Sequence, residues 1–276
     1  MNNTQPVLNY YNLSDDVKAF STTRHGGVSE GNYASLNINE YCGDSKANTD
    51  ANRLLLANEL GIDANHIIMP HQTHGVESRI IGEEFANLPD GVKKMLLEGV
   101  DAVMTNIPGM CIGVSTADCI PVLLYDEEHH AAAAIHAGWR GTQARIVHKA
   151  VQEMRMAYQT DPTKLKAVIG PGISLDNFEV GDEVYAAFEQ AAFDMSTIAE
   201  ERIKRNPNAD DPAKAFERKW HINLPLANIQ MLTHNGVDEA NILNTGICTF
   251  DNADSYFSAR RLGIESGRIY TGIIIR

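Results

Sequence analysis

A thiol and an imidazole stand in one apolar stretch of this chain. Residues 115–142 read STADCIPVLLYDEEHHAAAAIHAGWRGT, and they carry Cys119 and His136 at the two ends of a pair of apolar runs. The acidic segment 126–130 separates these runs, so the pattern predicts a β-hairpin that brings the two side chains together. Thiolate sulfur and imidazole nitrogen are the ligands that zinc prefers.

A third ligand is available upstream, where PHQTHGVES contains His71 and His74. One of these histidines with Cys119 and His136 gives three protein ligands, and catalytic zinc sites combine three such ligands with an open fourth position. Single ligands spread along a chain are a less specific pattern than paired CxxC motifs. A buried thiol and a core histidine are therefore the structural alternative.

Two charged neighbours add to this pattern. Asp118 directly precedes the thiol, and an acid in an apolar run is costly unless it is paired, hydrogen-bonded or catalytic. Arg140 lies in HAGWRGT, where a strand is expected to lead into a helix, and a helix N-terminus beside an arginine suits an anion. The alternative is that the glycines serve a tight turn while Trp139 fills the core.

The elements that must position these residues follow from periodicity. Short apolar runs predict buried strands at DAVMTN, CIGVS, IPVLLYD, AAAAIHAG, KAVIGPGI and the C-terminal GRIYTGIIIR. Helical spacing and stop signals predict helices over about 46–60, 141–158, from about 182 to beyond 202, and 224–234. The polar segment 205–219 is expected to be a loop or a helical connector.

Helices and strands are interspersed without strict alternation, and no glycine-rich phosphate-binding motif follows a strand. This order disfavours Rossmann and P-loop folds and predicts an α/β (α+β) layered fold with mixed β-sheets flanked by helices. At 276 residues, one or two domains are compatible with the length.

Composition limits the partners and the compartment. The chain has 23 basic and 36 acidic residues, a net charge of −13, which disfavours nucleic acid and anionic membranes. The N-terminal sequence lacks the pattern of a signal peptide and no apolar run approaches a membrane span, so we expect a cytoplasmic protein. The widely spaced cysteines 42, 111, 119 and 248 are expected to be free thiols.

A series of motifs along almost the whole chain is similar to that of the YfiH-type laccase-domain family. In order they are STTRHGGVSEGNYASLN, YCGD, QTHG, DAVMTN, STADCIPVLLYD, AAIHAGWRGT, IGPGIS, FEVGDEV, CTF and YFSARR. The resemblance implies one α/β domain over residues 1–276. It also implies a zinc ion held by the histidine of QTHG, the cysteine of TADC and the histidine of HAGWRG, which are His74, Cys119 and His136. His71 lies outside the family pattern.

The family, first described as multicopper polyphenol oxidases, is also described as purine nucleoside phosphorylases. The resemblance thus implies phosphorolysis of adenosine, inosine, guanosine and methylthioadenosine, with phosphate as co-substrate, and deamination of adenosine. Asp118 and Cys119 are the candidate catalytic residues, with Asp118 moving a proton. The predicted phosphate and substrate contacts are Arg24, Asn37, Gln72, Arg140 and Arg260, because an arginine fork matches phosphate oxygens. A structural ion pair is the alternative for each arginine.

Two other enzyme classes remain open. A copper polyphenol oxidase would need many histidines, usually in H-x-H pairs, and none of the ten histidines forms such a pair, although a His/His/Cys site can bind Cu²⁺ in vitro. A metal-free cysteine hydrolase acting on cell-wall precursors would use Cys119 as nucleophile and His136 as base.

Overall fold

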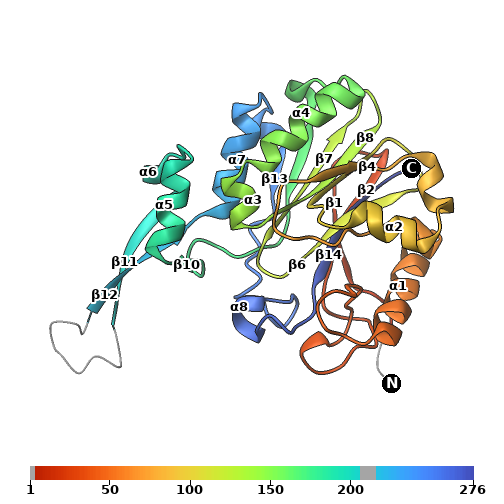
Figure 1. Cartoon of the computed structure of the whole chain (residues 1–276), viewed down its shortest axis with the longest axis horizontal. Coiled ribbons are helices and arrows are strands. Elements are labelled where there is room, and N and C mark those ends of the chain that lie inside the picture. The colour runs from red at the N-terminus through yellow and green to blue at the C-terminus, as the bar shows by residue number, and fades with distance from the viewer. Residues whose placement is uncertain (1–3, 206–215) are drawn as a thin grey trace.

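The computed structural model describes residues 4–205 and 216–276, which form helices and three mixed or antiparallel sheets (Figure 1). The largest sheet has six strands in the order β13-β9-β7-β8-β5-β4. Their bounds are β4 (Ser78–Ile80), β5 (Ala102–Thr105), β7 (Ile120–Asp126), β8 (Ala131–Ala137), β9 (Lys166–Ile169) and β13 (Ile242–Asn244). The predicted α/β class with mixed sheets is confirmed.

The central strands of this sheet are buried on both faces, which explains why their sequences are continuous apolar runs without alternation. On one face, Val122, Leu124 and Ile135 pack with residues of α4 (Ile146–Tyr158) and α7 (Leu224–His234). On the other face, Leu123 and Tyr125 pack against the second sheet. The β7–β8 hairpin predicted from the sequence therefore lies in the middle of the molecule.

The second sheet has five strands in the order β1-β2-β14-β6-β3. They are β1 (Leu8–Tyr11), β2 (Val17–Thr22), β3 (Ile67–Ile68), β6 (Cys111–Thr116) and β14 (Ile269–Ile275), the last being the predicted C-terminal strand. Its outer face packs against α1 (Lys46–Leu60), so helices, two sheets and a further helix form successive layers.

Helix α1 has the bounds that the sequence predicts. The Ser45 side chain accepts a hydrogen bond from the backbone N–H of Asn48, and Gly61 ends the helix with a φ of 73°. The helix predicted over 141–158 is instead two helices, α3 (Trp139–Gln143) and α4. Arg145 between them has a φ of 63°, which breaks the hydrogen-bonded helix although the apolar spacing continues.

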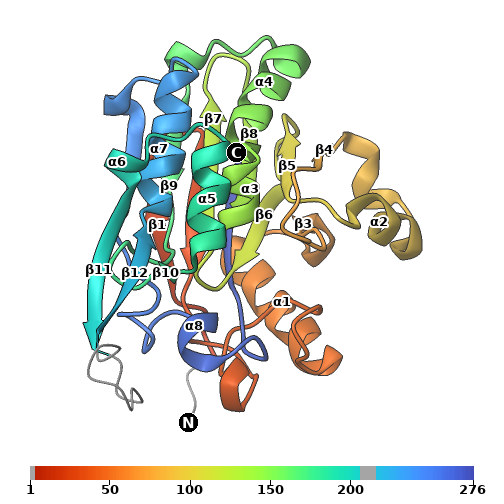
Figure 2. The ribbon, with the colours of Figure 1, turned by 60° about the vertical axis from the view of Figure 1, so that its left-hand side comes forward.

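The long helix predicted from 182 to beyond 202 is wrong. The chain forms α5 (Asp182–Gln190), α6 (Met195–Ile198) and then β11 (Ala199–Arg205). Strand β11 pairs with β12 (Phe216–Ile222), which also pairs with β10 (Glu179–Val180), and this three-stranded arm extends from the rest of the molecule (Figures 1 and 2). Of the segment 205–219, residues 206–215 lie outside the described residues, and 216–219 are strand rather than loop.

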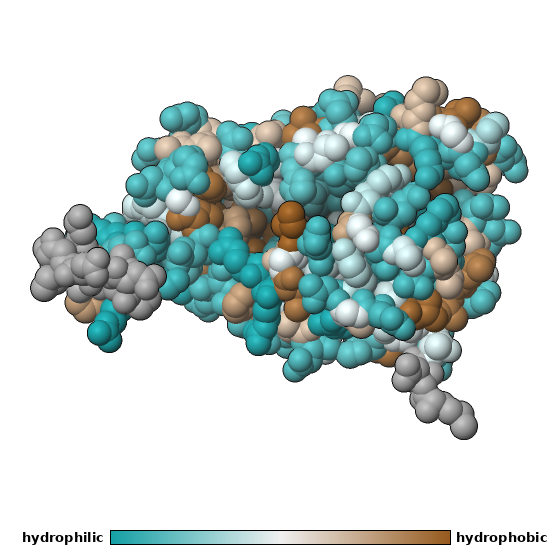
Figure 3. All heavy atoms as spheres, turned by 60° about the horizontal axis from the view of Figure 1, so that its bottom comes forward, coloured by the Kyte–Doolittle hydropathy of each residue, from teal (hydrophilic) through white to brown (hydrophobic). Residues whose placement is uncertain are grey.

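The remaining helices are short. They are α2 (Asp90–Leu97), α8 (Ala259–Leu262) and single 3-10 turns at Gly31–Tyr33, Ala64–His66, Glu83–Asn87, Pro162–Lys164 and Glu239–Asn241. Among the described helices none has the length and apolar character needed to cross a membrane. Hydrophilic side chains cover most of the face in Figure 3, and apolar ones lie there in separate small groups.

Candidate metal centre

The β7–β8 hairpin places Cys119 beside His136. Ile120 pairs with Ala137 and Pro121 pairs with His136. Cys119, which directly precedes β7, therefore lies at the same end of the hairpin as His136, near the end of β8. His74 reaches the same point from the loop that precedes β4. One potential ligand atom of each of His74, Cys119 and His136 lies within 4.8 Å of the other two. The predicted convergence of these three side chains is therefore present.

The loop that carries His74 is held by a carboxylate that sequence reasoning missed. Asp101 is fully buried immediately before β5. Its carboxylate accepts hydrogen bonds from the backbone N–H groups of Thr73 (3.3 Å), His74 (3.0 Å) and Gly75 (2.7 Å). His74 has a φ of 63°, a left-handed conformation that costs energy for a residue with a side chain, and these bonds compensate for it.

The same carboxylate orients His136. Nδ1 of His136 lies 2.7 Å from an Asp101 oxygen, and its backbone N–H donates to the Asp101 carbonyl oxygen at 2.8 Å. Because Nδ1 is hydrogen-bonded to Asp101, Nε2 is the ring nitrogen that remains available to bind a metal ion. Histidines that bind metals usually donate their second ring N–H to a carboxylate in this way. The argument applied to Asp118, that an acid beside an apolar run must have a partner, would have found Asp101 at the start of DAVMTN.

Charge stabilises the thiolate form of Cys119. Burial raises the pKa of the thiol, but the imidazoles of His136 and His74 outweigh it and lower this pKa to about 6. Burial lowers the pKa of His136, but the Cys119 and Asp101 charges outweigh it and raise this pKa to about 9. At neutral pH the pair is thus a thiolate and an imidazolium. The thiolate is the form of cysteine that binds metals and attacks electrophiles.

The centre is open on one side. His136 is buried, Cys119 is partly buried and His74 is exposed, so solvent reaches the ligand atoms from the His74 side. Gly138 lies directly against the three side chains, because a Cβ there would lie 3.0 Å from Cys119 Sγ and 3.1 Å from His74 Cδ2. Three ligands with one accessible face match the arrangement of catalytic metal sites.

We expect Gly138→Ala to weaken metal binding by roughly tenfold without unfolding the protein, because the added methyl group forces Cys119 or His74 to move by a few tenths of an ångström. Zinc affinity measured by competition with a chelator tests this. Gly91→Ala is the matched control, since no atom lies within 4 Å of a Cβ at that helical position. Equal zinc affinities in the two variants would contradict the expectation.

The Asp118 carboxylate forms two hydrogen bonds within the chain. Its carboxylate accepts from the Thr249 hydroxyl and from the backbone N–H of Arg260, both at 2.7 Å. These bonds attach α8 and the segment at Thr249 to the residue before Cys119. They give Asp118 a positioning role, and its predicted role in moving a proton stays a prediction.

The predicted substrate contacts Arg24 and Asn37 are used in packing. The Arg24 guanidinium donates to the carbonyl oxygens of Ala34 and Ala253, each at 2.8 Å. Asn37 is fully buried, and its amide donates to the Asp44 carboxylate at 2.9 Å. Neither residue has a contact with the metal-centre residues, and their binding of a substrate stays a prediction.

The other three predicted contacts also interact with neighbouring residues of the chain. The Gln72 side-chain amide donates to the carbonyl oxygen of Ser115 in β6 at 2.9 Å and accepts from the backbone N–H of Ser115 at 2.8 Å. The Arg140 guanidinium lies 4.3 Å from the Trp139 ring centroid at the start of the five-residue helix α3. The Arg260 guanidinium donates to a carbonyl oxygen of β10 at 3.1 Å. Their roles toward a substrate stay predictions.

His71 lies outside the group of three, as the family pattern implies. Its ring stacks on Tyr41 with centroids 4.1 Å apart, and its Nδ1 lies 2.8 Å from the Glu98 carboxylate. The backbone of His71 forms hydrogen bonds with the two residues on either side of Glu98. These bonds fix the start of the loop that carries His74.

Comparison with known proteins finds relatives that match this chain over nearly its whole length. The chain is 42% identical to a purine nucleoside phosphorylase of Bacteroides thetaiotaomicron over 98% of its length and 96% of that protein. It is 41% identical to adenosine deaminase RL5 of an unknown prokaryotic organism, over 96% and 97% of the two chains. The crystal structure of YfiH from Bacillus licheniformis superposes with a TM-score of 0.85 at 25% identity, covering 98% and 97% of the two chains.

The family relationship covers nearly the whole chain. Residues 18–276 match the family described as multi-copper polyphenol oxidoreductase laccase, and this range contains His74, Cys119 and His136. The resemblance found in the sequence motifs is confirmed: this chain belongs to the multi-copper polyphenol oxidoreductase laccase family.

Proposed function

We propose that the chain is a zinc-dependent purine nucleoside enzyme. Its reactions are phosphorolysis of adenosine, inosine, guanosine and methylthioadenosine, with phosphate as co-substrate, and deamination of adenosine. The observation that carries the proposal is the convergence of His74, Cys119 and His136 on an accessible point within 4.8 Å. The names of two similar proteins, a purine nucleoside phosphorylase and an adenosine deaminase, support nucleosides as the substrate class.

The residues present fit a zinc ion. Two imidazoles and a thiolate are a donor set typical of zinc, and the low pKa of Cys119 supplies the thiolate at neutral pH. Asp101 fixes the ring of His136, and glycine at position 138 leaves the space beside the sulfur free. When bound at such a site, zinc acts as a Lewis acid and lowers the pKa of water from about 16 toward 7.

The other residues bind, orient and transfer protons around this centre. Asp101 keeps Nδ1 of His136 engaged, so the ring cannot rotate during the reaction. Arg140 and Arg260 lie on the elements that flank the centre. They are the proposed hydrogen-bond donors to the bound phosphate, because their planar forks match phosphate oxygens. Asp118 is the proposed proton acceptor, at a carboxylate that Thr249 and Arg260 hold in place. The net charge of −13 supports small molecules rather than nucleic acids as partners.

Incubating the zinc-loaded protein with a panel of purine nucleosides, with and without phosphate, tests the proposed reactions. We expect release of free purine base together with ribose 1-phosphate only when phosphate is present, because phosphate is the attacking group. Conversion of adenosine to inosine should proceed without phosphate. Base release at the same rate in both conditions would identify a hydrolase instead, and absence of any turnover would refute the proposal.

A cysteine hydrolase acting on cell-wall precursors is a second candidate, favoured by the thiolate and imidazolium pair. The pKa of Cys119 is lowered to about 6 and that of His136 is raised to about 9, and these are the shifts expected of a nucleophilic thiolate held beside an imidazolium. In this case the protein would be active without metal.

Alkylation by iodoacetamide at pH 7 separates the two candidates. We expect metal-free protein to be alkylated at Cys119 within minutes and zinc-loaded protein to be protected there, because zinc holds the sulfur lone pair. Cys111 should remain unmodified in both, since it is fully buried and burial raises its pKa to about 12. Mass spectrometry of the peptides gives the result. Rapid alkylation of Cys119 in the zinc-loaded protein would favour the hydrolase.

The number of candidate metal sites is relevant to the copper oxidase that the family description names. Within residues 4–205 and 216–276, one group of at least three His, Cys, Asp or Glu side chains is arranged to hold a metal ion. One such group fits a single ion. Cu²⁺ competes well for nitrogen and sulfur ligands, so binding of copper in vitro at this same centre is part of the proposal.

A further inference from the structure

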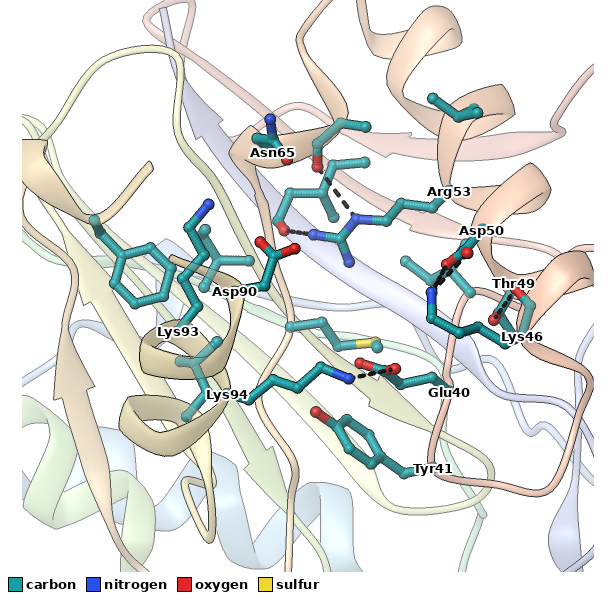
Figure 4. Close-up of a pocket in the computed structure, with 18 residues that line it drawn as sticks. Glu40, Tyr41, Lys46, Thr49, Asp50, Arg53, Asn65, Asp90, Lys93 and Lys94 are labelled. Atoms are coloured by element: carbon teal, nitrogen blue, oxygen red, sulfur yellow. Dashed lines mark hydrogen bonds and ion pairs between the residues drawn. The ribbon is translucent and has the colours of Figure 1, made fainter. Parts of the chain in front are cut away.

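A cavity lies between α1 and α2 (Figure 4). It encloses about 510 Å³, a volume typical of sites for small molecules. Strand β3 forms its floor, and none of the three metal-centre residues lines it.

The cavity combines an apolar interior with a charged rim. Ile38, Ile68, Met69 and Leu97 line the cavity with 2–7% of their surface exposed, and Leu54, which is 57% exposed, also lines it. This apolar lining suits a compact apolar body. The rim carries four cationic side chains, Lys46, Arg53, Lys93 and Lys94, and three carboxylates, Glu40, Asp50 and Asp90. The excess is one positive charge in a protein whose net charge is −13, so this rim is positive although the chain as a whole is acidic.

Two of the four cations are available to a ligand. Lys46 pairs with Asp50 at 2.6 Å and Lys94 pairs with Glu40 at 2.9 Å. Lys93 has no acidic partner in the part of the chain that the structure describes.

Arg53 is anchored and still has free donors. Its Nε and one Nη donate to the carbonyl oxygens of Ala64 and Ile67, which fixes the plane of the guanidinium. The second Nη has no acceptor among the described residues. Figure 4 shows the side chain reaching in from α1, with Lys93 and Asp90 on the facing helix α2. A fixed guanidinium at the edge of an apolar cavity is prepared to bind an anion without loss of side-chain entropy.

We propose that this cavity binds a small organic anion, in which a carboxylate or phosphate group is attached to a compact apolar body. The anionic group contacts Arg53 and Lys93, and the apolar body lies against Leu54, Met69 and Leu97. This site is separate from the metal centre and serves a ligand other than the proposed nucleoside substrate.

Three probes test the proposal on the zinc-loaded protein: phenyl phosphate, benzoate and the neutral analogue benzyl alcohol. Selective methyl labelling of isoleucine and methionine gives NMR signals within the cavity at Ile38, Ile67, Ile68 and Met69, and signals at Ile135 and Met154 in the core near α4 as internal references. We expect saturable shifts at the cavity methyls with phenyl phosphate or benzoate at roughly millimolar Kd, the strength usual for ligands of this size. The stronger of the two anions identifies the preferred group.

Lys93→Gln should weaken binding of the anion by about tenfold, because one charge-assisted hydrogen bond is lost, and it should leave binding of benzyl alcohol unchanged. Lys164→Gln is the matched control, since Lys164 is an exposed lysine paired with Glu128 elsewhere on the surface. Shifts at the reference methyls alone would place the anion elsewhere and overturn the proposal. Equal affinity in wild type and Lys93→Gln, or no shift with either anion, would also overturn it.

Discussion

Cys119→Ser should lose both the bound zinc and nearly all nucleoside turnover. Serine keeps the shape of the side chain but does not ionise near neutral pH, so it cannot replace a thiolate whose pKa is about 6. With two imidazoles left, the site retains two of its three ligands. Turnover should fall by roughly a thousandfold or more, because the Lewis acid of the proposed reactions is lost with the metal. Elemental analysis of the purified protein and steady-state kinetics measure the two losses.

Cys42→Ser is the matched control for this experiment. Cys42 is another partly buried cysteine, but its sulfur contacts Asn37 and a backbone carbonyl rather than the metal centre. This variant should keep about one zinc per chain and wild-type turnover. His74→Ala should behave like Cys119→Ser, because it removes another of the three ligands. Full activity of Cys119→Ser together with wild-type folding would show that the centre is not where the reaction occurs.

Much of the centre could be predicted because its ligands stand in uninterrupted local patterns. The two apolar runs that join Cys119 to His136 are long and buried on both faces, so their pairing as a hairpin follows from the sequence. The choice of His74 over His71 did not follow from spacing. It depended on the family motif, because both histidines lie in a loop whose path is set by hydrogen bonds to residues 97–101, between α2 and β5.

Asp101 shows what local patterns do not contain. Its six hydrogen bonds involve partners at residues 73–75, 77 and 136, and only the tertiary structure brings these together. Asp118 was found from the same kind of argument, yet its partners Thr249 and Arg260 are more than one hundred positions away. The sequence therefore indicates that a buried acid needs a partner, without identifying the partner.

The errors in secondary structure have a related cause. The segment AEERIKR has strong helix formers, but β11 forms because its backbone pairs with β12 over seven residues. Tertiary pairing there outweighs intrinsic propensity. Helices α1 and α7 were predicted with their correct bounds because capping residues mark their ends, with Ser45 and Gly61 for the first.

Asp101→Asn should lower zinc affinity by about 10- to 100-fold, the usual effect of removing a carboxylate that orients a metal-binding histidine. An amide has one acceptor oxygen where the carboxylate has two, and its NH₂ group would face donors of His136 or of residues 73–75. Leaving such a buried donor unpaired costs about 1–3 kcal/mol, so the free energy of unfolding should also fall. Because its partners hold the pKa of Asp101 below its usual range against the effect of burial, this stabilisation is present at neutral pH and is lost as the pH falls.

A carboxylate at the other end of the same hairpin separates the positioning role of Asp101 from a general effect on folding. Asp126 is also buried, lies 2.9 Å from Nδ1 of a histidine, His129, and accepts two backbone N–H groups. Asp126→Asn should therefore lower stability by a comparable amount while leaving zinc affinity unchanged. Chelator competition and chemical denaturation of both variants give the two quantities. Excess zinc should restore turnover in Asp101→Asn, because the three ligands remain and only their orientation has weakened. If the two variants bind zinc equally well, or if saturating zinc restores none of the lost turnover, Asp101 does not act through the orientation of His136.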